Sequence, residues 1–161
     1  MSQQRLETER ELDTVSDGEH TLEHGDSLFQ VLLVEDNAFV SDLFEYALRK
    51  FQGELGEPAH GVMMARTGIE ALRTLERTRP DLVIVDHYLP GMTGCALLRR
   101  MRAMEVHEKT PVVVISMGGD EIRKEALAAG ATLFMDKPVQ LTQMLTALRS
   151  LVADAKEQSC H

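Results

Sequence analysis

The chain is short of positive charge, of cysteine and of long apolar stretches. Its 17 basic residues against 26 acidic ones give a net charge of −9, which excludes nucleic-acid binding through a broad positive surface. Cys95 and Cys160 offer neither a disulfide framework nor a metal-motif spacing, so they suit a reducing compartment. No apolar run reaches the roughly 18 residues of a membrane span, and no basic start with an apolar stretch opens the chain. We therefore predict a cytoplasmic protein with no membrane insertion and no nucleic-acid partner.

The negative charge is concentrated in the first part of the chain. Residues 1–27 hold eight acidic and two basic side chains and few large apolar ones, so this segment cannot bury enough surface to offset the entropy of ordering. We predict a disordered extension over 1–27, a globular domain over 28–155 and a short tail over 156–161. The domain is long enough for one core, since a chain of about 150 residues buries roughly 68–70% of its unfolded surface.

From Leu28 onward, short apolar runs alternate with segments of helical periodicity. The runs VLLV, LVIV and VVVI are apolar without alternation, which is typical of parallel strands covered on both faces. Thr67 and Glu70 fit a capping box at the start of one helix. The predicted strands are 30–34, 61–65, 82–85, 112–115 and 132–135. Five units, each a strand followed by a helix, predict a doubly wound, flavodoxin-like α/β domain with five helices and a parallel sheet in the order 2-1-3-4-5.

Polar and charged residues follow the predicted strands, where the ligands of such sheets bind. Glu35 and Asp36 follow the first strand, and Asp86 follows the third. Ser116 follows the fourth strand and Lys137 follows the fifth. Like charges about 4 Å apart repel by on the order of 4 kcal/mol at an effective dielectric of about 20, so three carboxylates require a cation. Mg²⁺, or Mn²⁺ in its place, has the preference for oxygen ligands that fits this site.

These residues could together transfer a phosphoryl group. A carboxylate beside Mg²⁺ and a lysine can attack phosphorus and form an aspartyl phosphate. The metal and Lys137 would neutralise the equatorial oxygens, and the Ser116 hydroxyl would donate to one of them. The residues alone leave simpler roles open, as a turn-forming acid for Asp86 and as helix caps for Glu35 and Asp36.

Four segments at these spacings resemble the receiver domain of two-component response regulators. They are VLLVEDN at 31–37, DLVIVDHYLPGMTG at 81–94, VVVIS at 112–116 and MDKPV at 135–139. The resemblance covers about Phe29 to Ala153 and implies a chemotaxis-regulator-like signalling protein that is not an enzyme. Since few residues follow the fifth helix, we expect a single-domain regulator. We expect it to receive its phosphoryl group from a sensor histidine kinase or a phosphotransfer protein. Its output would be a relay step or binding to an unknown downstream protein.

The resemblance also implies how the acidic residues divide their work. Asp86 is then the phosphoacceptor, and Lys137 matches the invariant lysine of the family. Asp36, Asp86 and the backbone carbonyl of Tyr88 are the implied Mg²⁺ ligands, with Glu35 assisting through water.

The resemblance also implies a switch that involves the fourth and fifth strands. Ser116 matches the switch hydroxyl and Phe134 the switch aromatic, although an aromatic residue at a strand end is often part of a core. Pro138 is expected after a cis peptide bond. The resemblance implies that phosphorylation remodels the surface formed by the fourth helix, the fifth strand and the fifth helix. We expect the protein to be a monomer or to form a weak homodimer through this surface. We interpret Met144 and Leu151 as an extra apolar edge of the fifth helix, which points to a partner or dimer surface.

Three positions modify this picture. Met117 stands where the family usually has a small residue, so its side chain either swings aside or slows phosphoryl entry. Tyr88 would shield the phosphoryl group from water, and we therefore expect a long-lived phosphorylated state. We predict that His87 is a solvent-facing loop residue.

Two other functions stay open at this point. A module that keeps the receiver fold but signals without phosphorylation would fit the departure at Met117. A phosphatase of the haloacid dehalogenase type also forms an aspartyl phosphate, but such enzymes resemble D-x-D after their first strand. Here Asp86 follows the third strand and Tyr88 occupies the place of the second acid.

Overall fold

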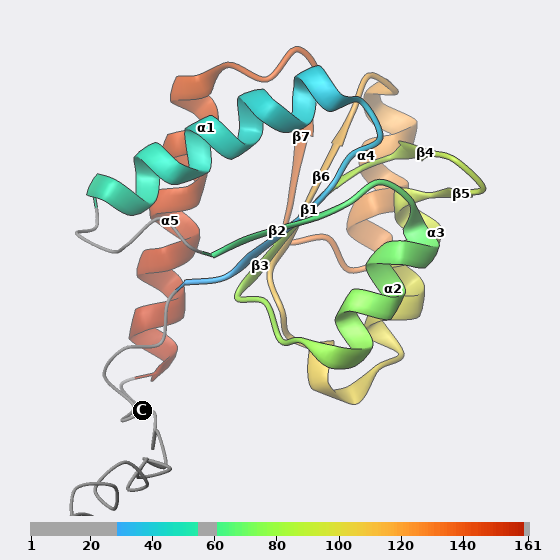
Figure 1. The fold of residues 1–161 in the computed structure, drawn as a ribbon. Helices are drawn as coiled ribbons and strands as arrows, with labels where there is room; N and C mark the ends of the chain where they lie inside the picture. The colour runs from blue at the N-terminus through green and yellow to red at the C-terminus, as the bar shows by residue number, and fades with distance from the viewer. Residues whose placement is uncertain (1–28, 55–60, 160–161) are drawn as a thin grey trace, which may run out of the picture.

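The computed structural model describes residues 29–54 and 61–159. The predicted acidic extension over 1–27 and the residue Cys160 lie outside the described residues. The described chain forms a five-stranded sheet with helices on both sides, and a two-stranded hairpin at one end (Figure 1). No helix in these ranges is long and apolar enough to cross a bilayer.

The main sheet has the predicted order. Its strands are β1 (Val31–Val34), β2 (Val62–Ala65), β3 (Leu82–Asp86), β6 (Val112–Ser116) and β7 (Leu133–Asp136). They lie in the order β2-β1-β3-β6-β7, and every neighbouring pair is parallel. The prediction of a five-stranded parallel sheet in the order 2-1-3-4-5 is therefore confirmed, and all five strands present their carboxyl ends at one edge.

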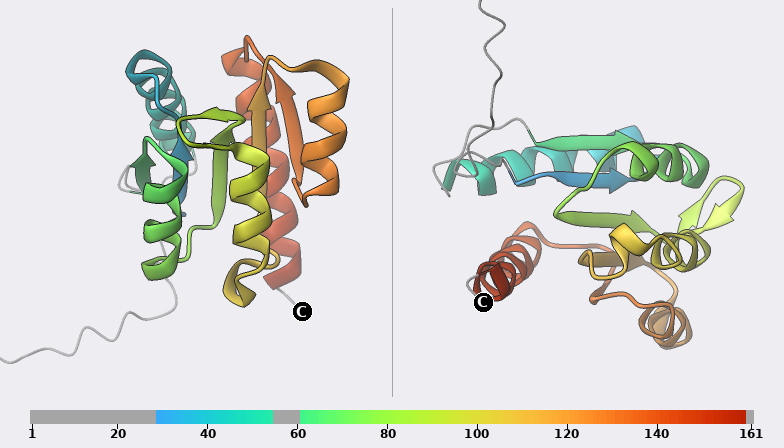
Figure 2. Two further views of the ribbon diagram at one scale, coloured as in Figure 1. Left: turned by 90° about the vertical axis from the view of Figure 1, so that its right-hand side faces the viewer. Right: turned by 90° about the horizontal axis from the view of Figure 1, so that it is seen from below.

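Five helices cover the sheet. They are α1 (Ala38–Glu54), α2 (Gly68–Arg77), α3 (Gly94–Arg102), α4 (Gly119–Ala128) and α5 (Leu141–Ser159). Figure 2 shows α1 and α5 on one face and α2, α3 and α4 on the other. Because successive strand residues point to opposite faces, Val83 and Val85 of β3 enter the core under α2, α3 and α4, and Ile84 enters the core under α1 and α5. The α5 helix continues past residue 155, where the globular domain was expected to end.

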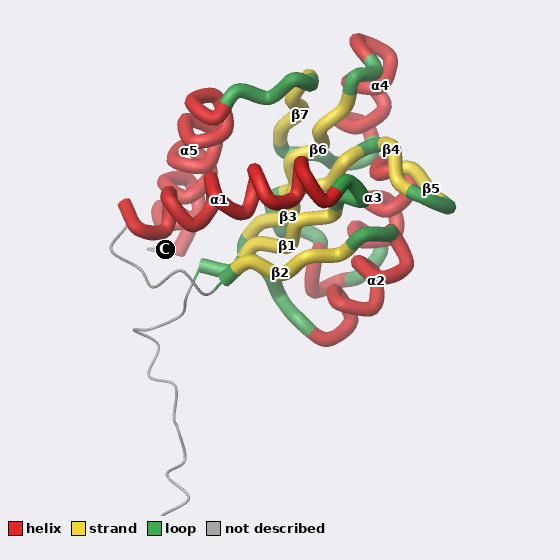
Figure 3. The backbone as a smooth tube through the Cα atoms, turned by 45° about the horizontal axis from the view of Figure 1, so that its top comes forward, coloured by secondary structure: helices red, strands yellow, loops and turns green. Residues whose placement is uncertain are grey.

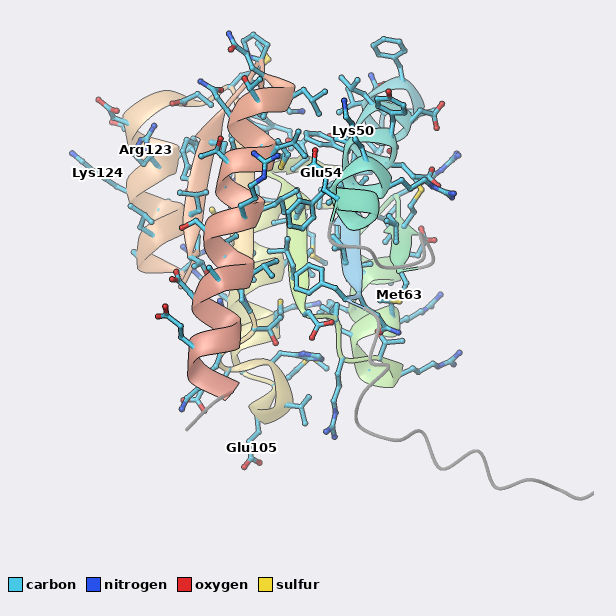
Figure 4. All side chains as sticks on the ribbon, turned by 90° about the vertical axis from the view of Figure 1, so that its left-hand side faces the viewer. Lys50, Glu54, Met63, Glu105, Arg123 and Lys124 are labelled. Carbon is cyan, nitrogen blue, oxygen red and sulfur yellow. The ribbon has the colours of Figure 1, made fainter. Side chains whose placement is uncertain are left out.

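An ion pair supports the packing of α1 against α5. Arg149 Nη2 of α5 donates to Glu54 Oε2 at 2.7 Å, and Figure 4 shows Glu54 at the end of α1 beside α5. Met144 of α5 is fully buried between these helices and the sheet. Its interpretation as part of an exposed apolar edge was wrong, because its position on α5 turns it toward the sheet; Leu151 is only half-buried. In α1, by contrast, the apolar side chain of Leu43 is 50% exposed.

The capping box of α2 differs in one bond from the expected pattern. Thr67 Oγ1 accepts from the backbone N of Glu70 at 3.1 Å, as predicted. The Glu70 carboxylate, however, accepts from the backbone N of Arg66 at 3.0 Å, one residue before the cap. Both bonds satisfy donors near the start of the helix, so the box performs the same task with a shifted partner.

Two short elements were not anticipated from the sequence. The strands β4 (Tyr88–Leu89) and β5 (Met92–Thr93) form a small antiparallel hairpin between β3 and α3 (Figure 3). A single turn of 3-10 helix, η1 (Glu105–His107), follows α3. Pro90 and Gly91 make the turn of the hairpin, and Gly91 has a φ of +80°, a conformation that glycine adopts without steric cost.

The hairpin returns the chain so that α3 begins against the end of β3. The backbone N of Gly94 donates to the carbonyl oxygen of His87 at 2.7 Å. A Cβ atom at Gly94 would lie 2.6 Å from the carbonyl oxygen of Asp86 and 2.9 Å from the Cα of His87. Only glycine allows this contact, so Gly94 fixes the start of α3 relative to the strand end.

We expect Gly94→Ala to lower the free energy of unfolding by about 1–3 kcal/mol, because backbone atoms must shift to admit the methyl group. Gly53→Ala is the matched control, since Gly53 lies exposed in α1 and a Cβ there meets nothing within 4 Å. That control should gain roughly 0.5–1 kcal/mol from helix propensity. Urea unfolding measures both; equal effects of the two substitutions would contradict the close contact at Gly94.

Candidate functional site

The acidic residues predicted at the strand ends lie together. Glu35 and Asp36 follow β1, Asp86 ends β3, and these two strands are neighbours in the sheet. One carboxylate oxygen from each of the three residues lies within 4.8 Å of the other two. Lys137, after β7, donates from Nζ to Asp86 Oδ2 at 2.9 Å and to Glu35 Oε2 at 3.4 Å. The edge of the sheet thus gathers three carboxylates around one ammonium group.

The loop between β1 and α1 holds Glu35 in place. Glu35 Oε1 accepts from the backbone N of Asn37 at 3.1 Å, and its backbone oxygen accepts from Ser41 Oγ at 3.4 Å. Asn37 Oδ1 in turn accepts from the backbone N of Val40 at 3.2 Å, in the first turn of α1. Asn37 therefore caps α1. Asn37 thus takes the helix-capping role that the sequence left open for Glu35 and Asp36. The Asp36 side chain is exposed on the solvent side of the acidic cluster.

The cluster is largely withdrawn from water. Glu35 is 3% and Asp86 6% exposed. Burial raises the pKa of Glu35 and the charge of Asp86 adds to the rise, while the Asn37 hydrogen bond and Lys137 oppose it. Burial by itself would lower the pKa of Lys137, but its hydrogen bond to Asp86 and the two carboxylate charges outweigh that effect, and the pKa rises. The ammonium form is thus strongly favoured, and three carboxylates face one positive charge.

This charge arrangement fits a divalent cation. With Glu35, Asp36 and Asp86 ionised, Lys137 leaves two negative charges uncompensated at the cluster. All three acidic residues offer oxygen ligands, which hard cations such as Mg²⁺ prefer. One acid is exposed and two are buried, so the site is open to solvent on the side of Asp36.

Asp86 has a defined orientation within the cluster. Its Oδ1 accepts from the backbone N of Tyr88 at 3.2 Å, and its Oδ2 accepts from Lys137. The peptide bond between Lys137 and Pro138 is cis, as the sequence predicts. The backbone N of Lys137 donates to the carbonyl oxygen of Ser116 at 2.9 Å, which extends the pairing of β6 with β7 to the site.

The two predicted switch residues lie beyond this cluster. Ser116, at the end of β6, is fully buried, and its Oγ accepts from the backbone N of Gly118 at 3.0 Å. Phe134 of β7 is buried on the face that α4 covers. The guanidinium carbon of Arg123 lies 4.9 Å from the centre of the Phe134 ring. The structure therefore places Phe134 under α4 in a packed position.

The residues expected to control access are both exposed. Tyr88 is 57% and Met117 76% exposed. In this conformation the Met117 side chain projects into solvent. The ring of Tyr88 makes an edge-on contact with the ring of His87, with 4.9 Å between the ring centres.

The prediction that His87 faces solvent was wrong. His87 is 3% exposed, and its Nδ1 is buried without a hydrogen-bond partner. The reason is that the strand geometry continues beyond Asp86, since the backbone N of His87 still donates to the carbonyl oxygen of Ile115 at 2.9 Å. The alternation of β3 then sends His87 to the same face as Val83 and Val85. Continuing the period of two past Val85 would have revealed this from the sequence.

We expect Lys137→Met to destabilise the protein by about 2 kcal/mol in the absence of divalent cations, because two buried carboxylates then lose their neutralising charge. Millimolar Mg²⁺ should restore part of this loss, since it supplies positive charge to the same oxygens. The matched control is Lys124→Met, on the outer side of α4 (Figure 4), where a change below about 0.5 kcal/mol is expected. Urea unfolding with a chelator and with Mg²⁺ provides the measurement, and equal losses for both variants would refute the electrostatic role of Lys137.

Residues 31–149 match the family described as response regulator receiver domain. One curated relative is a protein-glutamate methylesterase/protein-glutamine glutaminase of Rhodospirillum rubrum. It is 38% identical, over 68% of this chain and 28% of its own length. Another is the phosphate regulon transcriptional regulatory protein PhoB of Rhizobium meliloti, which is 30% identical over 80% of this chain and 54% of its own length. The chain thus spans about half or less of the length of these relatives.

Solved structures give the same result over nearly their whole lengths. A putative response regulator from Chloroflexus aurantiacus has a TM-score of 0.70 at 26% identity, covering 79% of this chain and 99% of that one. The receiver domain of the sensor histidine kinase PA1611 from Pseudomonas aeruginosa, which holds a magnesium ion in its active-site cleft, has a TM-score of 0.68 at 27% identity, with coverage of 79% and 99%. With the fold, the strand order and the family match in agreement, this chain belongs to the response regulator receiver domain family.

Proposed function

We propose that Asp86 accepts a phosphoryl group from a histidine kinase or a phosphotransfer protein and that this modification switches a protein-binding surface. The observation that carries the proposal is the 2.9 Å hydrogen bond from Lys137 Nζ to Asp86 Oδ2, within a cluster of three carboxylates. Receiver domains generally act as phosphoacceptors in signalling, and the family match extends across this cluster.

Mg²⁺ is the cofactor that the cluster fits. Glu35, Asp36 and Asp86 would hold it, together with the backbone carbonyl of Tyr88. The ion supplies positive charge that stabilises the oxygens of the transferring phosphoryl group. The related receiver domain of PA1611 has a magnesium ion in its cleft.

The chain's own residues account for the transfer step. A carboxylate oxygen of Asp86 attacks phosphorus, and the bond between phosphorus and the donor's imidazole nitrogen breaks as the oxygen–phosphorus bond forms. Lys137, already directed at Asp86, binds the developing negative charge. Ser116 Oγ accepts from the backbone N of Gly118, so its own proton is free to be donated to a phosphoryl oxygen.

The same contacts connect the site to a surface. The phosphoryl group would draw Ser116 out of its bond with Gly118, just before the start of α4. Phe134 and the Arg123 side chain over it lie between β7 and α4, and Arg123 also donates to Asp136 at 2.6 Å. Leu127 of α4 is 49% exposed. The surface of α4, β7 and α5 is thus the region we assign to partner binding, in a monomer or a weak homodimer.

Access to the phosphoryl group depends on Tyr88 and Met117. The high exposure of the Met117 side chain favours the alternative in which it swings aside. The Tyr88 ring projects from the residue two positions after Asp86 and is anchored at the backbone by the bond to Asp86 Oδ1. We propose that it slows the attack of water and extends the life of the phosphorylated state.

Asp86→Asn should abolish labelling by acetyl phosphate and Mg²⁺, because an amide oxygen is too weak a nucleophile to form the acyl phosphate. Asp120→Asn, which changes an exposed acid of α4, should label like the wild type. Intact-protein mass spectrometry measures the added phosphoryl group. Undiminished labelling of Asp86→Asn would refute the assignment, and absence of labelling in the wild type would favour a phosphorylation-independent module.

Tyr88→Ala should shorten the lifetime of the phosphorylated protein by roughly tenfold, which corresponds to about 1.4 kcal/mol in the barrier to hydrolysis. Met117→Ala should change the rate of labelling only slightly, because the Met117 side chain already lies in solvent. Loss of the phosphoryl group after removal of acetyl phosphate gives both rates. An unchanged lifetime in Tyr88→Ala would show that the ring does not shield the site.

A further inference from the structure

A second group of metal-binding side chains lies on the other side of the Asp86 segment. It consists of His87, Cys95 and Glu125, which come from the end of β3, the first turn of α3 and α4. A ring nitrogen of His87, Cys95 Sγ and a carboxylate oxygen of Glu125 all lie within 4.8 Å of one another. None of the three belongs to the acidic cluster, and the phosphoryl transfer described above does not use them.

Two of these side chains are fully enclosed. Cys95 is completely buried and His87 is 3% exposed, while Glu125 lies half-buried at the rim. His87 Nδ1 is the only buried side-chain nitrogen or oxygen in the described part of the chain that lacks a hydrogen-bond partner. A buried polar atom without a partner is energetically unfavourable, so this imidazole is poised for an interaction that the protein alone does not provide.

The backbone holds the first two residues of the cluster in position. Gly94 packs directly on the backbone of Asp86 and His87, and its N donates to the His87 carbonyl oxygen at 2.7 Å. Because Cys95 follows Gly94, this contact fixes the backbone positions from which the imidazole and the thiol extend. The relation of α3 to α4 is also fixed, since Arg102 Nε and Nη2 donate to the carbonyl oxygen of Gly130 at 3.2 and 2.8 Å.

The chemistry of the three donors indicates the ion. An imidazole, a thiol and a carboxylate form the mixed nitrogen, sulfur and oxygen set that suits Zn²⁺, whereas Mg²⁺ prefers oxygen alone. From zinc–ligand bonds of about 2.0–2.3 Å, ligand atoms around a tetrahedral ion are about 3.3–3.7 Å apart. Side-chain rotations that move the ligand atoms by about 1 Å would therefore bring them to the spacing of a zinc site with three protein ligands.

We propose that His87, Cys95 and Glu125 bind a Zn²⁺ ion, with water as the fourth ligand. As the zinc–sulfur bond forms, the Cys95 thiol loses its proton to solvent. In the absence of the ion, burial and the nearby Glu125 charge raise the pKa of Cys95, and the thiol stays protonated. The bound ion joins the segment after Asp86 to α3 and α4.

One cation competes for the cluster. Arg99 Nη2 donates to Glu125 Oε1 at 3.3 Å, in a pair whose two side chains are 54% and 39% exposed. Exposed pairs of this kind contribute little to stability. Zinc binding to the carboxylate can therefore displace Arg99 or use the second oxygen.

Cobalt(II) is the probe that tests the site, because a cobalt–thiolate bond produces a charge-transfer absorption in the near ultraviolet that oxygen or nitrogen ligands do not. The full chain is used with Cys160→Ser, so that Cys95 is the only thiol, and with excess Mg²⁺ to occupy the acidic cluster. We expect the absorption to saturate at one cobalt per chain and to disappear on addition of Zn²⁺.

Variants then assign the ligands. Cys95→Ser should remove the absorption, and Glu125→Gln and His87→Gln should each weaken cobalt binding at least roughly tenfold. Glu121→Gln, an exposed acid one turn earlier in α4, should bind as tightly as the parent. Far-ultraviolet circular dichroism verifies that each variant is folded; the half-buried Glu125 provides a test even if the two buried replacements prevent folding. Absence of the absorption in the Cys160→Ser protein, or equal binding by Glu125→Gln and Glu121→Gln, would overturn the proposal.

Discussion

The structure depends on one electrostatic constraint, the placement of three carboxylates at adjoining strand ends. Such a group is unstable without positive charge, and Lys137 supplies part of it through its bonds to Asp86 and Glu35. The sheet order makes this possible, because β1 and β3 are neighbours and β7 reaches the same edge through β6. The remaining negative charge favours binding of a cation, and in the proposed function that cation would offset the repulsion between the carboxylates and the anionic phosphoryl group.

The contacts that hold the site together also lead away from it. Lys137 is joined to Ser116 through the backbone, Ser116 to Gly118 before α4, and Phe134 lies beneath Arg123 of that helix. On the other side, Gly94 ties α3 to the backbone next to Asp86. A change of charge at Asp86 is therefore one contact away from α3 and three contacts away from the residue before α4, which is the arrangement a local switch with a surface readout requires.

Much of the fold and the acidic cluster could be predicted from the sequence, because both follow from periodicity and from the rule that parallel strands end at one edge. The apolar runs gave the five strands to within about one residue, and Glu35, Asp36, Asp86 and Lys137 were identified as the residues after them. The failures are of another kind. His87 and Met144 are buried where exposure was expected. For His87 the period of two was not continued past Val85, and for Met144 the packing of α5 on the sheet decides which side the side chain faces. The grouping of Cys95 with His87 and Glu125 combines three elements, and no spacing along the chain reveals it.

The most direct test of the central claim is the response of the backbone amide resonances to beryllofluoride and Mg²⁺, which together imitate an aspartyl phosphate. The account predicts shifts at the strand ends around Asp86 that extend through Ser116 to α4, β7 and α5, and no shifts of this kind in Asp86→Ala. Unchanged spectra of the wild-type protein, or identical shifts in Asp86→Ala, would contradict it.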